Sequence, residues 1–298
     1  MTCPLCNEKK YLMLRQVSIS YLSDLWRKQI GFDPFYGNPL GETMEKRSCI
    51  RCGLIYFYPE FYGDGPFYSI LSKNEWYYES EKWEFDKALE LVRQVRPKSI
   101  LEIGCGAGEF LHKASTGVDY SLGLDINGSA LALARQKGLE VSDRSIFELE
   151  ETFDMIFLFQ VLEHLQMPGN ILRAVESRLN PGGMLVIALP NPTGYLKDMG
   201  IVLLDMPPHH NTIWSKESFD YLAKMLGMEM VRYETEQLRF SHYQSLLYCM
   251  IEQNSKKPSL KFLQKIVVRI MAPFLYISGG NRMVGQTHFV SFRKTTGE

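Results

Sequence analysis

Residues 101–110 read LEIGCGAGEF, an apolar segment that runs directly into three glycines at alternate positions. The apolar part predicts a buried strand, and the residues after the last glycine predict the start of a helix. Glycines at such a turn let the backbone bend sharply and approach a ligand closely, and a helix start favours negative charge. The segment therefore predicts a cofactor loop formed by Gly104, Gly106 and Gly108, although its GxGxG spacing differs from the GxGxxG dinucleotide fingerprint.

From about residue 86, segments that predict helices alternate with segments that predict strands. The predicted strands are apolar throughout, which favours a parallel sheet covered by helices on both faces. Predicted helices cover 85–97, 108–115, 129–138, 170–183 and 216–227, and predicted strands cover 99–104, 121–126, 153–160, 184–190, 228–235 and 287–294.

The chain divides into three segments of different character. Residues 1–55 carry two pairs of cysteines, residues 56–85 are dense in Tyr, Phe and Trp, and residues 86–298 carry the α/β pattern. We expect these to be a small metal-binding module, a connecting or substrate-covering segment, and an α/β domain with a helical insertion at about 240–280.

An acidic residue lies at the end of the second predicted strand of this pattern. Asp125 lies about twenty residues after the glycines, where a carboxylate can accept hydrogen bonds from a ribose diol. A nucleotide-binding fold for another cofactor, or a decayed site, is the alternative interpretation.

These ordered elements resemble class I S-adenosylmethionine-dependent methyltransferases over about residues 86–240 and the final strand. LEIGCGAGEFL is similar to the first motif of that family, Asp125 to its ribose-binding acidic residue, and FDMIFLFQVLEHL to its fourth-strand motif. The resemblance implies a Rossmann-like sheet and methyl transfer from S-adenosylmethionine. It also implies that the glycine loop wraps the methionine end of the cofactor and that Asp125 holds the ribose. The further cofactor contacts that it implies are Ile126, Ser145 and Ile146 around the adenine and Gln160 on the floor near the sulfonium.

Four of the six cysteines form two CxxC pairs, Cys3 with Cys6 and Cys49 with Cys52. Two such pairs can supply a tetrahedral shell of four thiolates, which suits a structural zinc ion because no coordination position stays open. A redox pair or an iron–sulfur cluster is the alternative. A four-cysteine head before this core resembles bacterial sugar and small-molecule methyltransferases, including enzymes that act on nucleotide-linked sugars, and implies that the head helps to bind or cover the acceptor.

A hydroxyl or carbon acceptor needs a base to take its proton, and histidine has a suitable pKa. His209 and His210, in PPHHNTIWS after the strand predicted over 184–190, are the candidate catalytic residues. Sugar C-methyltransferases carry a His-Glu-His pattern here that this sequence does not reproduce, so O- and C-methylation both stay open. A hydrogen-bonded loop role is the structural alternative for both histidines.

The formal net charge of −1 gives no reason to expect a nucleic acid or an anionic membrane as the main partner. We expect a sugar or nucleotide-sugar acceptor; an RNA base methyltransferase and a non-catalytic, zinc-stabilised binding protein are the alternatives. The first residues do not read as a signal peptide, so we expect a cytoplasmic protein. The basic, apolar segment at about 260–275 allows membrane-surface contact without favouring it, and the oligomeric state stays open.

Overall fold

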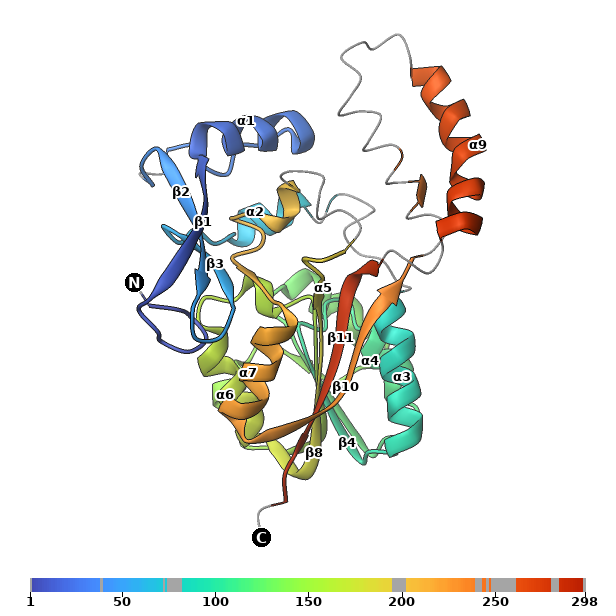
Figure 1. The fold of residues 1–298 in the computed structure, drawn as a ribbon. Helices are drawn as coiled ribbons and strands as arrows, with labels where there is room; N and C mark the ends of the chain where they lie inside the picture. Colours follow the sequence, from blue (N-terminus) through green and yellow to red (C-terminus); the bar gives the residue numbers. More distant parts are fainter. Residues whose placement is uncertain are drawn as a thin grey trace.

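The computed structural model describes residues 2–37, 40–71, 73, 82–194, 202–238, 243–244, 247, 261–279 and 284–296. A large sheet with helices on both faces carries a smaller sheet at one end, and helix α9 (Lys261–Gly279) lies beyond the same end of the large sheet (Figure 1).

The large sheet has seven strands in the order β10-β11-β8-β7-β4-β5-β6. The strands from β6 to β8 pair in parallel, and β11 pairs antiparallel with β8 and β10. This arrangement confirms the predicted Rossmann-like α/β fold. The strands are β4 (Ser99–Ile103), β5 (Tyr120–Leu124), β6 (Val141–Ser142), β7 (Phe153–Phe159), β8 (Leu179–Pro190), β10 (Met228–Gln237) and β11 (Val284–Lys294).

The apolar strands pack against helices on both faces. Along β7, Met155 and Phe157 join the apolar cluster beneath one helical layer, while Ile156 and Leu158 join the cluster on the opposite face. Each buried side chain of this size stabilises the fold by about 2 kcal/mol relative to an exposed one. The first layer contains α3 (Trp83–Val95), α4 (Glu109–Ala114) and α5 (Gly128–Gln136), and the second contains α6 (Pro168–Ser177) and α7 (Lys216–Leu226).

The helix predicted over residues 170–183 is too long. Helix α6 ends at Ser177, and β8 already begins at Leu179, which pairs with Phe153 of β7. The next pair joins Met155 to Met184, so residues 180–183 bulge out of the ladder. Gly182 adopts a φ of 76° there, which places the Pro-Gly-Gly run in an irregular strand start instead of a helix end.

The small sheet forms a head above the carboxyl ends of the parallel strands. Its order is β1-β2-β3-β9, and its elements are β1 (Tyr11–Ser18), α1 (Ile19–Ile30), β2 (Thr43–Cys49), β3 (Ile55–Tyr58), the neighbouring α2 (Gly65–Leu71), and β9 (Thr212–Ile213). The fourth strand, β9, comes from the loop after β8, far from the head in sequence. Ile55 pairs with Ile213 and Tyr56 with Thr212, so the head and the α/β domain share one ladder.

The head also shares its apolar core with the α/β domain. Leu5, Leu54 and Tyr56 belong to the same buried cluster as Leu172 of α6. At Gly169 of α6, an added Cβ would lie 2.4 Å from the carbonyl oxygen of Leu5. The turn between Cys3 and Cys6 therefore packs directly on the start of α6.

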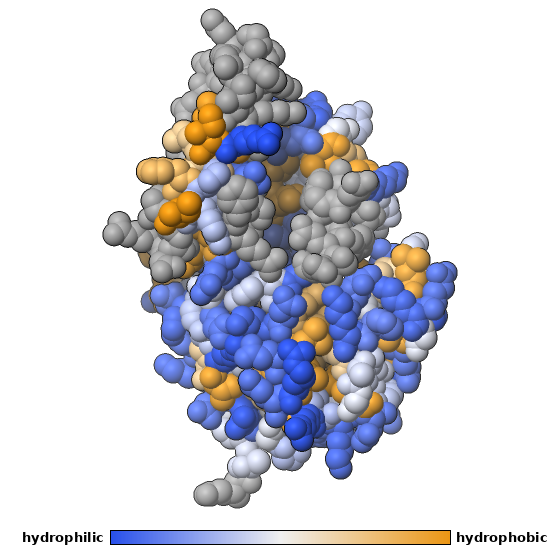
Figure 2. Space-filling model, turned by 90° about the vertical axis from the view of Figure 1, so that its right-hand side faces the viewer, coloured by the Kyte–Doolittle hydropathy of each residue, from blue (hydrophilic) through white to orange (hydrophobic). Residues whose placement is uncertain are grey.

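Helix α9 forms the described part of the predicted helical insertion; the remainder of 240–280 lies mostly outside the described residues. Ile270, Phe274 and Ile277 are exposed by 67%, 70% and 83%. Hydrophobic side chains interrupt the upper part of the face in Figure 2, whereas the lower part, over the large sheet and its helices, is mostly hydrophilic. Among the described residues, no helix is long and apolar enough to cross a bilayer.

Replacing Gly169 by alanine tests the contact between the head and α6. We expect Gly169→Ala to lower the free energy of unfolding by about 2 kcal/mol, because the new methyl group overlaps the Leu5 carbonyl. The matched control is Gly128→Ala at the start of α5, where an added Cβ meets no atom within 4 Å. Urea unfolding of both variants measures the difference, and equal effects would contradict the packing.

Candidate functional site

The predicted glycine loop connects β4 to α4 at the carboxyl edge of the sheet. Gly104, Gly106 and Gly108 have φ values of 75°, 52° and 76°, a region that side chains disfavour. An added Cβ would lie 2.3 Å from Val161 at Gly104 and 2.3 Å from Leu139 at Gly108. Space and backbone conformation therefore both require glycine at these two positions.

Asp125 directly follows β5 and is tied to this loop. Its Oδ2 accepts a hydrogen bond of 2.8 Å from the Gly106 amide, and its Oδ1 accepts one of 2.8 Å from the Asn127 amide. The carboxylate is half-buried and each oxygen keeps a further lone pair. The adjacent Ile126 is 91% exposed, so an apolar side chain stands beside the carboxylate.

The turn after β6 differs in detail from the predicted adenine contact. Ser145 caps the short helix η1 (Ile146–Glu148): its hydroxyl accepts from the Phe147 amide, and its own amide donates to Glu148. Ile146 is only 5% exposed and packs in the core, whereas Phe147 is 58% exposed. The apolar side chain that this turn presents outward is therefore Phe147, not Ile146.

Gln160 follows β7 at the same edge, with a φ of 55°. Its amide donates to the Ala188 carbonyl at 2.8 Å, and its Nε2 donates to Oε1 of Glu84 at 3.2 Å. Glu84 lies on α3 and is 4% exposed. The predicted cofactor residues after β4, β5 and β7 thus all lie at the carboxyl ends of neighbouring parallel strands.

The two predicted catalytic histidines join a third in one cluster. His209 and His210 lie in the loop before β9 with their rings stacked 4.4 Å apart, and His164 of the short helix η2 (Leu162–His164) lies 4.7 Å from His209 and 4.9 Å from His210. One ring nitrogen from each residue lies within 4.8 Å of the others, a spacing that a metal ion could also use.

Burial keeps two of these rings neutral. It lowers the pKa of His164 to about 3 and the pKa of His209 well below its usual value. Nδ1 of His164 lies 2.6 Å from the His209 carbonyl oxygen, and Nδ1 of His209 lies 2.9 Å from the Leu204 carbonyl oxygen. A carbonyl only accepts, so both rings carry their proton on Nδ1.

His210 lies between two carboxylates. Its Nδ1 is 3.3 Å from Asp205 Oδ1, and its Nε2 is 3.9 Å from Glu163 Oε1. Glu163 is 1% exposed, and neither of its carboxyl oxygens accepts a hydrogen bond from the part of the chain that the structure describes. Burial raises the pKa of Glu163 to about 7, while the proximity of His210 acts in the opposite direction. Asp205 is therefore the closer carboxylate to the His210 ring.

His210 and Asp205 line a cavity between the head sheet and the carboxyl edge of the large sheet. Apolar walls come from Val17 of β1, Met206 and Trp214, and polar walls come from strands β1, β2 and β11. The cavity thus brings the predicted catalytic loop and the predicted substrate-side head to the same space.

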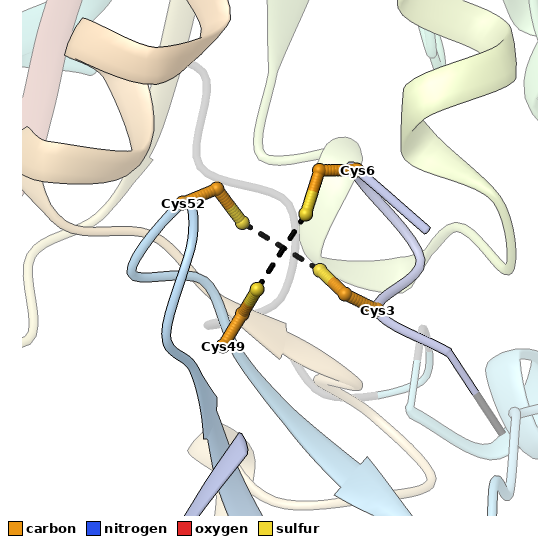
Figure 3. A group of neighbouring side chains, drawn as sticks. All are labelled: Cys3, Cys6, Cys49 and Cys52. Atoms are coloured by element: carbon orange, nitrogen blue, oxygen red, sulfur yellow. Dashed lines mark hydrogen bonds between the residues drawn. The ribbon is translucent and has the colours of Figure 1, made fainter. Parts of the chain in front are cut away.

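The four predicted metal ligands converge in the head. The thiols of Cys3, Cys6, Cys49 and Cys52 point toward one centre (Figure 3). Sγ atoms of Cys3 and Cys52 are 3.6 Å apart, those of Cys6 and Cys49 are 3.5 Å apart, and all four lie within 4.8 Å of one another. Each pair is followed by a residue with positive φ, Asn7 at 59° and Gly53 at 70°, which closes the turn.

Sequence reasoning missed four features of the site: Glu163, Glu84, the outward position of Phe147, and the cavity walls supplied by the head. The sequence offered one hint of Glu163, its place beside His164 in the exit loop of β7. Its burial, which is unusual for an acidic residue, is visible only in the structure. The sequence offered no hint of the cavity walls, since they depend on strand register.

A family model described as a methyltransferase domain matches residues 76–233, more than half of the chain. A ubiquinone biosynthesis O-methyltransferase of Ruegeria pomeroyi is 31% identical over 166 residues, covering 50% of this chain and 66% of the relative. The namesake of Pseudomonas putida strain W619 is 31% identical over 111 residues, covering 33% and 48%. The chain thus matches about half to two thirds of the length of these relatives.

Among solved structures, a methyltransferase from Archaeoglobus fulgidus described as SAM-dependent aligns with a TM-score of 0.48 and 20% identity, covering 70% of this chain and 94% of that one. The range that the family model matches includes the glycine loop, Asp125 and the strands from β4 to β8. This chain belongs to the family of methyltransferase domains that this model describes.

Proposed function

We propose that this enzyme methylates a hydroxyl group of a small-molecule acceptor, a sugar or a nucleotide-sugar, bound in the cavity between the head and the large sheet. The observation that carries the proposal is His210, which lines this cavity beside two carboxylates. The relatives named O-methyltransferases favour an oxygen acceptor over a carbon acceptor.

The cofactor fits the carboxyl edge of β4, β5 and β6. Gly104, Gly106 and Gly108 leave room for close backbone approach, and Asp125 keeps lone pairs for the ribose hydroxyls. Ser145 stays a proposed neighbour of the adenine, and Ile126 and Phe147 offer the two exposed apolar side chains beside it. Gln160 is proposed to form the floor, with its side chain held by Glu84. When bound, S-adenosylmethionine supplies the methyl group.

The residues of the chain supply orientation and a proton acceptor. As the acceptor oxygen is methylated, its O–H bond breaks and the proton passes to the imidazole of His210. The resulting imidazolium is stabilised by Asp205 at 3.3 Å and Glu163 at 3.9 Å. His209 stacks on His210 and is itself anchored to the Leu204 carbonyl, so it positions the base.

Zinc in the head is part of the same proposal. A tetrahedral ion with Zn–S bonds of about 2.3 Å holds its sulfurs about 3.8 Å apart. The two close sulfur pairs, at 3.5 and 3.6 Å, are near this value, and the donor set is four thiols. Such an ion would join the turn that packs on α6 to the end of β2, and it would have no open position for catalysis.

The ribose assignment predicts a specific loss of cofactor affinity. Asp125→Asn removes the charge and one acceptor, so we expect the affinity for S-adenosylhomocysteine to fall about tenfold or more. Asp119→Asn is the matched control, because Asp119 is exposed and precedes β5 at its opposite end. Isothermal titration calorimetry measures both; unchanged affinity in Asp125→Asn would remove this residue from the site.

The proton-acceptor assignment predicts a loss of turnover without a loss of cofactor binding. We expect His210→Ala to reduce kcat about a hundredfold, because general-base catalysis contributes about this much. Transfer of labelled methyl groups to a panel of sugars and nucleotide-sugars measures the rate. The control is His112→Ala on the exposed side of α4. A His210→Ala enzyme with normal kcat would contradict the assignment.

The metal assignment predicts one zinc ion per chain and its loss on removing one ligand. We expect Cys49→Ser to release zinc and to lower the free energy of unfolding by about 3 kcal/mol or more. Cys105→Ser changes a buried thiol outside the cluster and should keep the ion. Inductively coupled plasma mass spectrometry counts the metal. Equal zinc in the two variants would contradict the four-thiol site.

A further inference from the structure

Two basic side chains lie side by side on neighbouring strands of the head sheet, on the wall of the cavity. Arg15 of β1 is the direct partner of Lys46 of β2 in the antiparallel ladder, so their side chains leave the sheet on the same face. Both line the cavity that contains His210. Like charges in directly opposed positions destabilise a sheet, so the pair is not explained by the stability of the head.

A β-bulge creates this pairing. Met13 pairs with Arg47, and the next pair joins Arg15 to Lys46, so Leu14 is the extra residue. Without the bulge, Leu14 would stand opposite Lys46 and Arg15 would point to the other face. The irregularity therefore exchanges an apolar side chain for a guanidinium on the cavity wall.

Neither cation is neutralised by a close partner. Among the described residues, no carboxylate lies within 4.0 Å of either side chain, and the acidic residue of the cavity wall, Asp205, is 3.3 Å from His210. Burial lowers the pKa of Lys46, with Asp205 acting against this shift and Arg15 adding to it. The ammonium group is thus partly desolvated beside a second positive charge.

A third donor lies on the same wall. Gln286 of β11 lines the cavity, and its Nε2 is buried without an acceptor among the residues that the structure describes. A buried amide hydrogen without a partner costs about 1–3 kcal/mol, which a ligand oxygen would offset. Arg15, Lys46 and Gln286 thus line the same cavity as the proposed base, His210.

We propose that this wall binds an anionic group of the acceptor, a phosphoryl or carboxylate group, and so restricts the enzyme to acidic acceptors. The inference rests on the proposed function for the identity of the cavity as the acceptor site. Guanidinium and ammonium groups together recognise both kinds of oxyanion. A neutral sugar would leave the two positive charges without a counter-charge, so we expect it to bind more weakly than an acidic acceptor.

The test is calorimetric titration of the full chain with and without saturating S-adenosylhomocysteine. The probes are inorganic pyrophosphate, UDP-glucose and glucuronate, with glucose as the neutral comparator. Wild type is compared with Arg15→Gln, Lys46→Met and the control Lys28→Met, which removes an exposed charge on α1 outside the cavity. We expect at least one acidic probe to bind more tightly than glucose, and its affinity to fall about tenfold in the two cavity variants only.

Unfolding measurements separate this role from a structural one. Because each cavity variant removes a like-charge repulsion, it should be as stable as wild type or more stable while losing the probe. Preference for pyrophosphate and UDP-glucose identifies a phosphoryl group, and preference for glucuronate identifies a carboxylate. Acidic probes that bind no better than glucose, or that bind equally to the cavity variants, overturn the proposal. Failure to bind S-adenosylhomocysteine would instead contradict the proposed function.

Discussion

The site depends on a two-residue ladder between β3 of the head and β9 of the α/β domain. Ile55 pairs with Ile213 and Tyr56 with Thr212, directly after the two stacked histidines. Between His210 and β9, the Asn211 amide donates to the Glu163 carbonyl at 2.7 Å. The histidine loop is therefore held between the head sheet and the exit of β7, which fixes His210 on the cavity wall.

Through this arrangement, the cysteine cluster can affect the reaction indirectly, by way of the strands of the head. Cys49 ends β2, Cys52 lies in the turn to β3, and β3 is the strand that pairs with β9. An ion that holds the two turns together would stabilise β3 and, through it, the histidine loop, without touching a reacting atom. The same head supplies Arg15 and Lys46, so one small sheet would set both the position of the base and the charge of the acceptor wall.

Local patterns in the sequence were sufficient for the cofactor side of the fold. The glycine loop and Asp125 follow apolar strands, and strand, glycine and carboxylate are neighbours in the sequence as in space. The four cysteines were also predictable, because the spacing within each CxxC pair already determines the turn. The resemblance pointed to Ile146 and not to Phe147, because a strand-end motif does not say which side chain of a one-turn helix points inward.

The acceptor side could not be predicted because it is made of long-range contacts. Strand β9 has only two residues and no hydrophobic pattern of its own; pairing with β3 alone makes it a strand. The bulge at Leu14 shifts the register by one residue, and a shift of one residue decides which side chains face the cavity. Burial of Glu163 likewise arises from the packing of the head over the exit of β7.

The most direct test of this account is amide hydrogen exchange of residues 209–213 before and after the proposed zinc ion is removed from the head with a chelator. If the head holds the histidine loop through β3 and β9, exchange at Asn211, Thr212 and Ile213 should accelerate strongly on metal removal, while exchange in the glycine loop at 104–108 stays unchanged. Unchanged protection at 211–213 in metal-free protein would show that the loop is held independently of the head, and the central claim would be wrong.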